Sequence, residues 1–308
     1  MTLRIAHLTD VHLPLPVAGP AALLALPRRC GLAPFLGKRA SGLVSWALRR
    51  SFRHRAALLA TVREDVAAFR PHLVLVTGDL VHLALAGEFA AARRWLGELA
   101  RLAPVHLVPG NHDAYVAGAL EAHGGAWADW THGRVAHDDY PWSAAVGPLL
   151  LIGLSTAVPR PVGDAGGRLG AAQCARARRL LAAAAEAVRI VLLHHPPLPV
   201  GPRRRALEDR GAFAAVVREV GAELVLCGHE HRALKGALAG PAGPVPVLVG
   251  PSASLAEPGR RGGWLALELD PRHRTLRVTL RRFDGRGLVS ERRPERPLPP
   301  ARVREGAA

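Results

Sequence analysis

The sequence predicts an α/β fold built as a layered sandwich. Short apolar runs typical of buried strands alternate with longer helical patterns along the 308 residues. The predicted strands are Arg4–Thr9, Leu73–Thr77, Val105–Val108, Leu149–Leu154, Ile190–Leu193, Leu224–Cys227 and Val245–Val249. Helical patterns lie between them at Arg55–Phe69, Glu88–Ala100, Ala171–Ala187 and Arg205–Val220, which favours a sheet with helices on its faces. Two later runs, Leu265–Leu269 and Thr275–Arg281, alternate more and predict an antiparallel pair in a second sheet.

The composition excludes several classes of protein. Hydrophobic residues make up 49% of the chain, so wholesale disorder is not expected. The three cysteines have no CxxC spacing, which argues against a disulfide framework or a cysteine zinc site and fits a reducing, cytoplasmic setting. We expect no targeting segment and no membrane-spanning helix, because the early apolar stretch Leu13–Pro27 contains four prolines. The Pro/Arg-rich tail 291–308 is expected to be disordered or loosely packed.

The net charge of +16 allows two interpretations. It could attract a polyanion or an anionic membrane. Alternatively, it reflects a coding bias toward arginine, since only Lys38 and Lys235 among the 41 basic residues are lysine. The local clustering of charge is more informative than the total.

Polar motifs follow five of the predicted strands. They are Asp10-Val11-His12, Gly78-Asp79, Gly110-Asn111-His112-Asp113, His194-His195 and Gly228-His229-Glu230-His231. Ligands gather beyond the carboxyl ends of strands in open α/β sheets, so we expect the five loops to meet at one edge.

The residue types in these motifs suit a metal site. Carboxylate and imidazole without thiolate favour borderline-to-hard divalent ions such as Mn, Fe or Zn. Asp79 could bridge two cations through its two oxygens, and the Asn111 oxygen could complete a site without adding charge. Gly78, Gly110 and Gly228 each precede a candidate ligand and permit a close backbone approach. Each motif alone has a plainer explanation as a helix cap or solvated turn; their conjunction is what favours metal.

In this order, the five motifs resemble the calcineurin-like metallophosphoesterase family in its bacterial phosphodiesterase branch. The resemblance covers Thr2 to about Val249 and implies a four-layer αββα sandwich. It also implies a first metal ion held by Asp10, His12, Asp79 and His231, and a second held by Asp79, Asn111, His194 and His229.

The resemblance further implies that His112 acts on the substrate, by stabilising the transition state or protonating the leaving oxygen. Two such cations would activate a bridging water for in-line attack on phosphorus. Asp113 is expected either to orient His112 or a ligand, or to cap a helix. His195 is expected either to contact a metal ligand without binding the metal itself, or to face the substrate.

The domain is expected to span 1–290, with an insertion at about 13–54 that leaves the Asp10/His12 loop. Eight Arg or Lys residues lie in or just after this insertion, which contains no Asp or Glu and many apolar residues. It could lie on an anionic membrane, peripheral to its inner face, or form a packed helical hairpin with a solvated basic face.

Three functions remain open. The first is hydrolysis of a small phosphodiester or related ester. A protein phosphatase is disfavoured, because the Gly78-Asp79 motif lacks the Asp-Arg-Gly continuation found in protein phosphatases of the family. The second is peripheral membrane hydrolysis of a lipid-linked phosphate or pyrophosphate. The third, a nuclease or nucleic-acid binding protein, is less favoured because no additional DNA-facing domain is visible.

Overall fold

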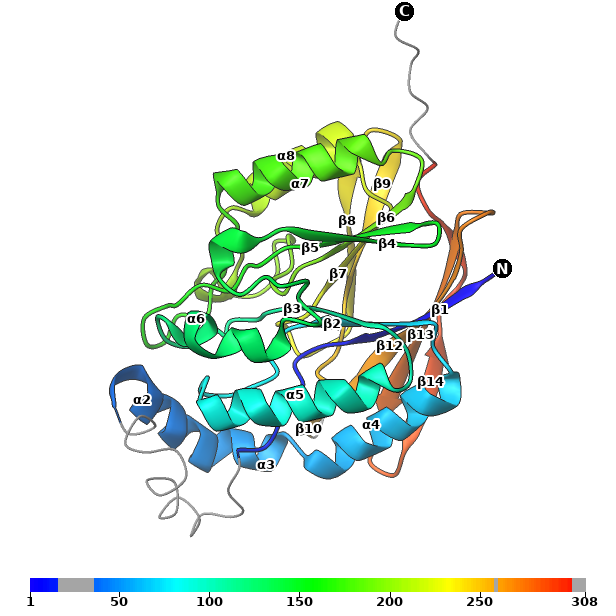
Figure 1. Ribbon diagram of the computed structural model, residues 1–308. Helices are drawn as coiled ribbons and strands as arrows, with labels where there is room; N and C mark the ends of the chain where they lie inside the picture. The colour runs from blue at the N-terminus through cyan, green and yellow to red at the C-terminus, as the bar shows by residue number, and fades with distance from the viewer. Residues whose placement is uncertain (16–35, 258–259, 301–308) are drawn as a thin grey trace, which may run out of the picture.

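The protein is a four-layer αββα sandwich. The structure, a computed structural model, describes residues 1–15, 36–257 and 260–300. Two sheets pack face to face, with α4 and α5 outside one sheet and α7 and α8 outside the other (Figure 1). The predicted fold class and its layers are therefore confirmed.

The first sheet joins the beginning of the chain to its end. Its order is β14-β13-β12-β1-β2-β3. These strands are β1 (Leu3–Leu8), β2 (Leu73–Thr77), β3 (Val105–Val108), β12 (Gly263–Asp270), β13 (Thr275–Phe283) and β14 (Leu288–Arg292). β1, β2 and β3 are parallel, whereas β12 runs antiparallel to β1 with Ile5 opposite Leu267.

The second sheet comes from the middle of the chain, in the order β4-β5-β6-β7-β9-β8. Its strands are β4 (Trp142–Val146), β5 (Leu149–Gly153), β6 (Val188–Leu192), β7 (Leu224–Cys227), β8 (Leu234–Gly240) and β9 (Gly243–Val249). β5, β6, β7 and β9 are parallel. A short pair, β10 (Ala256–Glu257) and β11 (Arg260–Arg261), stands apart.

Three apolar cores hold the layers together. α4 (Ala56–Phe69) packs Leu58, Val62 and Val66 inward at helical spacing, alongside α5 (Ala86–Ala100). α7 (Ala171–Ala183) and α8 (Arg210–Val220) cover the second sheet. Between the sheets lies a core of alternate strand residues, including Leu75 and Leu192. Short helices are α6 (Ala119–His123), η4 (Gly124–Trp127), η5 (His137–Asp139) and η6 (Arg203–Arg205).

One expectation was wrong. Leu265–Leu269 and Thr275–Arg281 do pair antiparallel, but they extend the first sheet from the free edge of β1 instead of forming a second one. Alternation shows that a strand has one buried face but not which edge it joins. In the tail, the end of β14 and β15 (Arg296–Pro297) pair with β13 and Leu298 is buried, while most of residues 291–300 are exposed. Residues 301–308 lie outside the described ranges.

The described part of the insertion is a continuous helical run. It consists of α2 (Gly37–Ser45), the π-helical turn η3 (Trp46–Arg50) and α3 (Ser51–Arg53). Leu43 and Trp46 are buried in the core beside α4 and α5. Residues 16–35 of the insertion lie outside the described ranges. Of the helices in the ranges that are described, none has the length and apolar character needed to cross a bilayer.

Candidate metal centre

The polar motifs meet where the carboxyl ends of the two sheets face each other. β1, β2 and β3 belong to the first sheet, and β6 and β7 to the second. The loops nevertheless converge: His231 Nε2 lies 3.1 Å from Asp10 Oδ1, and His194 Nε2 lies 3.4 Å from Asp79 Oδ2. The loops that were expected to meet at one edge of a single sheet therefore meet between two sheets.

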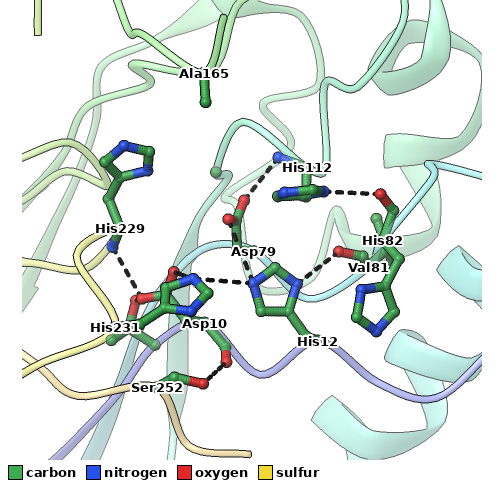
Figure 2. Close-up of polar contacts among 12 residues, drawn as sticks. Asp10, His12, Asp79, Val81, His82, His112, Ala165, His229, His231 and Ser252 are labelled. Carbon is green, nitrogen blue, oxygen red and sulfur yellow. Dashed lines mark hydrogen bonds and ion pairs between the residues drawn. The ribbon is translucent and has the colours of Figure 1, made fainter. Parts of the chain in front are cut away.

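The first group of possible metal ligands is Asp10, His12, Asp79 and His231, with one donor atom from each within 4.8 Å of the others. His12 Nδ1 lies 3.2 Å from the Val81 carbonyl, which orients Nε2 toward His231 at 3.3 Å (Figure 2). Asp10 accepts hydrogen bonds at Oδ2 from the Thr9 hydroxyl and the His229 backbone N–H. Its Oδ1 is buried and lies 3.1 Å from His231 Nε2, so a cation bound between these two atoms could contact both.

The second group is Asp79, His194 and His229, which share Asp79 with the first. His194 Nδ1 donates to the Thr77 carbonyl at 2.6 Å, so its Nε2 faces the site. A ligating histidine is commonly oriented by such a bond from its other nitrogen. Asn111 follows Gly110, whose backbone packs against Asp79. Asn111 Oδ1, His194 Nε2 and His229 Nε2 are all buried without hydrogen-bond partners, so a cation bound among them would satisfy all three.

The backbone is strained at these residues. Among the described residues, nine non-glycine residues have positive φ, and five of them are the candidate ligands Asp10, His12, Asp79, His229 and His231. Such conformations cost free energy and concentrate at functional sites. Glycine is required beside them: a Cβ on Gly110 would lie 2.3 Å from Asp79 Oδ1, and one on Gly228 would lie 1.8 Å from Thr9 Oγ1. The close approach predicted for these glycines is therefore present.

Asp113 fixes the loop that carries Asp79. Its Oδ2 accepts the backbone N–H groups of Asp79 and Gly110, and its Oδ1 accepts those of Leu80 and Val81. Glu88 fixes the far end of the same loop through the N–H groups of residues 82, 83 and 85. Of the two expectations for Asp113, the structure favours orientation of a candidate ligand, through its backbone, over capping of a helix.

The two other predicted histidines differ in position. His112 donates from Nδ1 to the His82 carbonyl at 2.8 Å, and its backbone N–H donates to Asp79 Oδ1 at 2.7 Å (Figure 2). Its Nε2 is left for another partner. His195 is fully buried, with Nδ1 on the Thr156 hydroxyl and Nε2 on the Ala165 carbonyl. Both of its nitrogens are therefore occupied, which favours support of its neighbour His229 over contact with substrate.

The charges within the cluster interact strongly. Burial alone would raise the pKa of Asp79, but the nearby histidines, His194 foremost, hold that pKa well below its usual range. Burial lowers the pKa of His12 and His229 far enough to keep both rings neutral. For His194, the two carboxylates outweigh burial and raise the pKa to about 9. A proton on His194 thus partly neutralises the negative charge of Asp79 and Asp10. A divalent cation bound there would neutralise the same charge.

Several residues at the site were not predicted from the sequence. His54 ends the insertion, bonds Ser254 Oγ at 2.6 Å, and forms a further possible ligand group with His12 and His231. His82 stacks on His12 with ring centroids 5.0 Å apart. Arg50 Nη1 lies 3.3 Å from His112 Nδ1. His82 follows Asp79 in the loop after β2, whereas Arg50 and His54 lie at the end of the insertion, so proximity in sequence was the available signal for all three.

Comparisons with known proteins point to one family. The sequence model for calcineurin-like phosphoesterases matches residues 3–233. Glycerophosphodiester phosphodiesterase GpdQ of Enterobacter lignolyticus (strain SCF1) is 32% identical over 172 residues, a match that spans 53% of this chain and 56% of the relative.

Two solved structures share the fold. Purple acid phosphatase PPD1 from yellow lupin seeds has a TM-score of 0.57 at 12% identity, covering 94% of this chain and 53% of the lupin chain. Plasmodium GAP50 has a TM-score of 0.57 at 11% identity, covering 98% of this chain and 90% of that one. At such identities the likeness concerns the fold alone. The match to the family's sequence model extends over most of the chain, and the chain therefore belongs to the calcineurin-like phosphoesterase family.

Proposed function

We propose that the protein is a phosphodiesterase that uses two divalent cations, within a catalytic domain of residues 1–290 that carries 13–54 as an insertion. The first cation would be held by Asp10, His12, Asp79 and His231, and the second by Asp79, Asn111, His194 and His229. The observation that carries the proposal is the set of buried oxygen and nitrogen atoms in these two groups that have no hydrogen-bond partner. The donors suit Mn, Fe or Zn.

Bound cations would supply Lewis acidity and an activated water for attack on phosphorus. The protein's own residues would position these groups and transfer the proton. Asp79 holds the two groups together, and Asp113 and Glu88 keep its loop in place. Burial and the charge of Arg50 lower the pKa of His112 to about 3, so its ring is neutral before substrate binds. The negative charge of an entering phosphate would raise the pKa of His112, so that Nε2 could take a proton from solvent and transfer it to the leaving oxygen.

Turnover of an aryl phosphodiester with and without Mn²⁺ tests this proposal. We expect hydrolysis by the Mn²⁺-loaded protein and none after chelation. Asp79→Asn should abolish the metal-dependent rate, because one change weakens both ligand groups. Asp129→Asn is the matched control, since this carboxylate is 69% exposed and pairs with Arg93 instead of a candidate ligand. Full activity in Asp79→Asn would refute the shared role of Asp79.

A second candidate, hydrolysis of a lipid-linked phosphate or pyrophosphate at a membrane, is favoured by the outer face of the insertion. Val44, Leu48 and Phe52 recur every four residues and are 58%, 72% and 67% exposed. Exposed arginines at 49 and 53 flank them, and the helical run has no acidic residue. A basic helix with an exposed apolar stripe is typical of binding to anionic bilayers. A nucleic-acid function has no comparable feature in its favour among the described residues.

Flotation with vesicles of phosphatidylcholine and phosphatidylglycerol tests the second candidate. The wild-type chain should float with the vesicles, and Leu48→Ser combined with Phe52→Ser should remain at the bottom. Val162→Ser is the control, since Val162 is similarly exposed at 65% but lies outside the insertion. If the double variant floats as well as the wild type, this face does not bind the membrane.

A further inference from the structure

A cavity of about 150 Å³ opens beside the first ligand group. Candidate ligands His12 and His231 line it together with His112. The remaining wall is rich in arginine, contributed by Arg50, Arg53 and Arg205. A substrate whose phosphorus lies at the ligand groups would therefore have its neighbouring substituent in this cavity.

The three arginines differ in their partners. Arg53 forms an ion pair with Glu257, which also lines the cavity. The other cavity glutamate, Glu230, lies 3.9 Å from Arg232. Arg205 donates to the His229 carbonyl at 2.7 Å. In the described part of the chain, neither Arg205 nor Arg50 makes an ion pair with a carboxylate.

Among the described residues, Arg50 in particular has no anionic partner. Its Nη1 lies 3.3 Å from His112 Nδ1, but that nitrogen carries the proton donated to the His82 carbonyl at 2.8 Å. His112 therefore cannot accept a hydrogen bond from Arg50 at this atom. The Tyr115 hydroxyl contacts Arg50 but is neutral, since its pKa is raised by burial. A partly buried guanidinium without a counter-charge is costly unless a ligand supplies the anion.

Arg50 is held in place by the insertion. α2 packs its Gly42 so close to Tyr115 that a Cβ would lie 2.4 Å from the hydroxyl oxygen. Arg39, also on α2, donates to the carbonyls of Leu83 and Ala84 in the loop that begins at Asp79. The insertion thus presents Arg50 to the cavity from a fixed position.

We propose that Arg50 and Arg205 bind a second phosphate of the substrate, so that the preferred substrate is a diphosphate diester rather than a diester with one phosphate. This inference rests on the proposed function. A guanidinium matches phosphate oxygens through two parallel N–H groups. In the reaction, the oxygen of water bonds to one phosphorus and the bond from that phosphorus to the bridging oxygen breaks. The two monoester products share the two hydrogens of the water.

Two substrates with Mn²⁺ test the proposal: UDP-glucose, a diphosphate diester, and bis(p-nitrophenyl) phosphate, which has one phosphate. We expect the ratio of kcat/KM for the diphosphate to that for the aryl diester to fall about 10- to 100-fold in Arg50→Gln, as for a lost charge-assisted bond. Arg205→Gln should also lower the ratio, which provides a second test if Arg50→Gln folds poorly. Arg218→Gln, an exposed substitution on α8 and outside the cavity, should leave kcat/KM for both substrates unchanged.

The outcomes separate this inference from the proposed function. If the wild type hydrolyses neither substrate, the proposed function fails. If it hydrolyses the aryl diester but not UDP-glucose, or if the ratio stays within about twofold in both arginine variants, the second-phosphate site is wrong while the phosphodiesterase remains.

Discussion

Replacing Asp113 with asparagine should destabilise the fold although the two side chains have nearly the same shape. Each carboxylate oxygen of Asp113 accepts two backbone N–H groups, at distances of 2.8 to 3.2 Å. In Asp113→Asn one oxygen becomes an NH₂ group, which faces two of those donors and cannot accept from them. A buried donor left without a partner costs about 1–3 kcal/mol, so the variant should lose about 2–6 kcal/mol. That is a large part of the ~5–15 kcal/mol that stabilises a typical domain.

Urea unfolding followed by circular dichroism measures this loss. The control is Asp129→Asn, which weakens only an exposed ion pair with Arg93 at 3.6 Å and should cost less than about 1 kcal/mol. Because Asp113 holds the backbone of Asp79, the variant should also bind Mn²⁺ more weakly where it remains folded. A stability within about 1 kcal/mol of wild type would show that these hydrogen bonds do not hold the loop.

Three further outcomes are expected. His112→Ala should retain metal but lose about 10²–10⁴-fold in turnover, as measured on the aryl diester; an unchanged rate would exclude a catalytic role. Glu223→Ala should lower the free energy of unfolding in urea by about 3–5 kcal/mol, because Arg189 would remain buried without its carboxylate partner. An unchanged free energy of unfolding would mean that water replaces the carboxylate. Mn²⁺ affinity should rise about tenfold per pH unit between pH 7 and 8, because His194, with a pKa of about 9 without metal, must release its proton to bind; calorimetry showing no pH dependence would contradict this.

Most of the fold was predictable from the sequence, because the strands are apolar runs that end at polar residues or glycine. β2, β3 and β7 have the predicted bounds, and α4 and α5 begin or end within two residues of theirs. The position of β12 beside β1 was not predictable, because pairing across more than 250 residues depends on which strand edge remains free.

The candidate ligands were predictable for a different reason. Asp10, Asp79 and His229 follow strands directly, so the parallel arrangement alone brings them to the carboxyl ends of the sheets. Arg50 and His54 reach the site through the insertion, whose path over the protein no strand pattern specifies. Residues such as Arg50 and His54 can be assigned to the site only once the tertiary packing is known.

The metal content of the purified chain tests the central claim most directly. After chelation, reloading with Mn²⁺ and removal of free metal, inductively coupled plasma mass spectrometry should find two ions per wild-type chain. Asp79→Asn should retain less than one, while Asp129→Asn should retain two. A wild-type chain that holds no Mn, Fe or Zn ion under any loading condition would contradict the assignment of these loops as a two-cation centre.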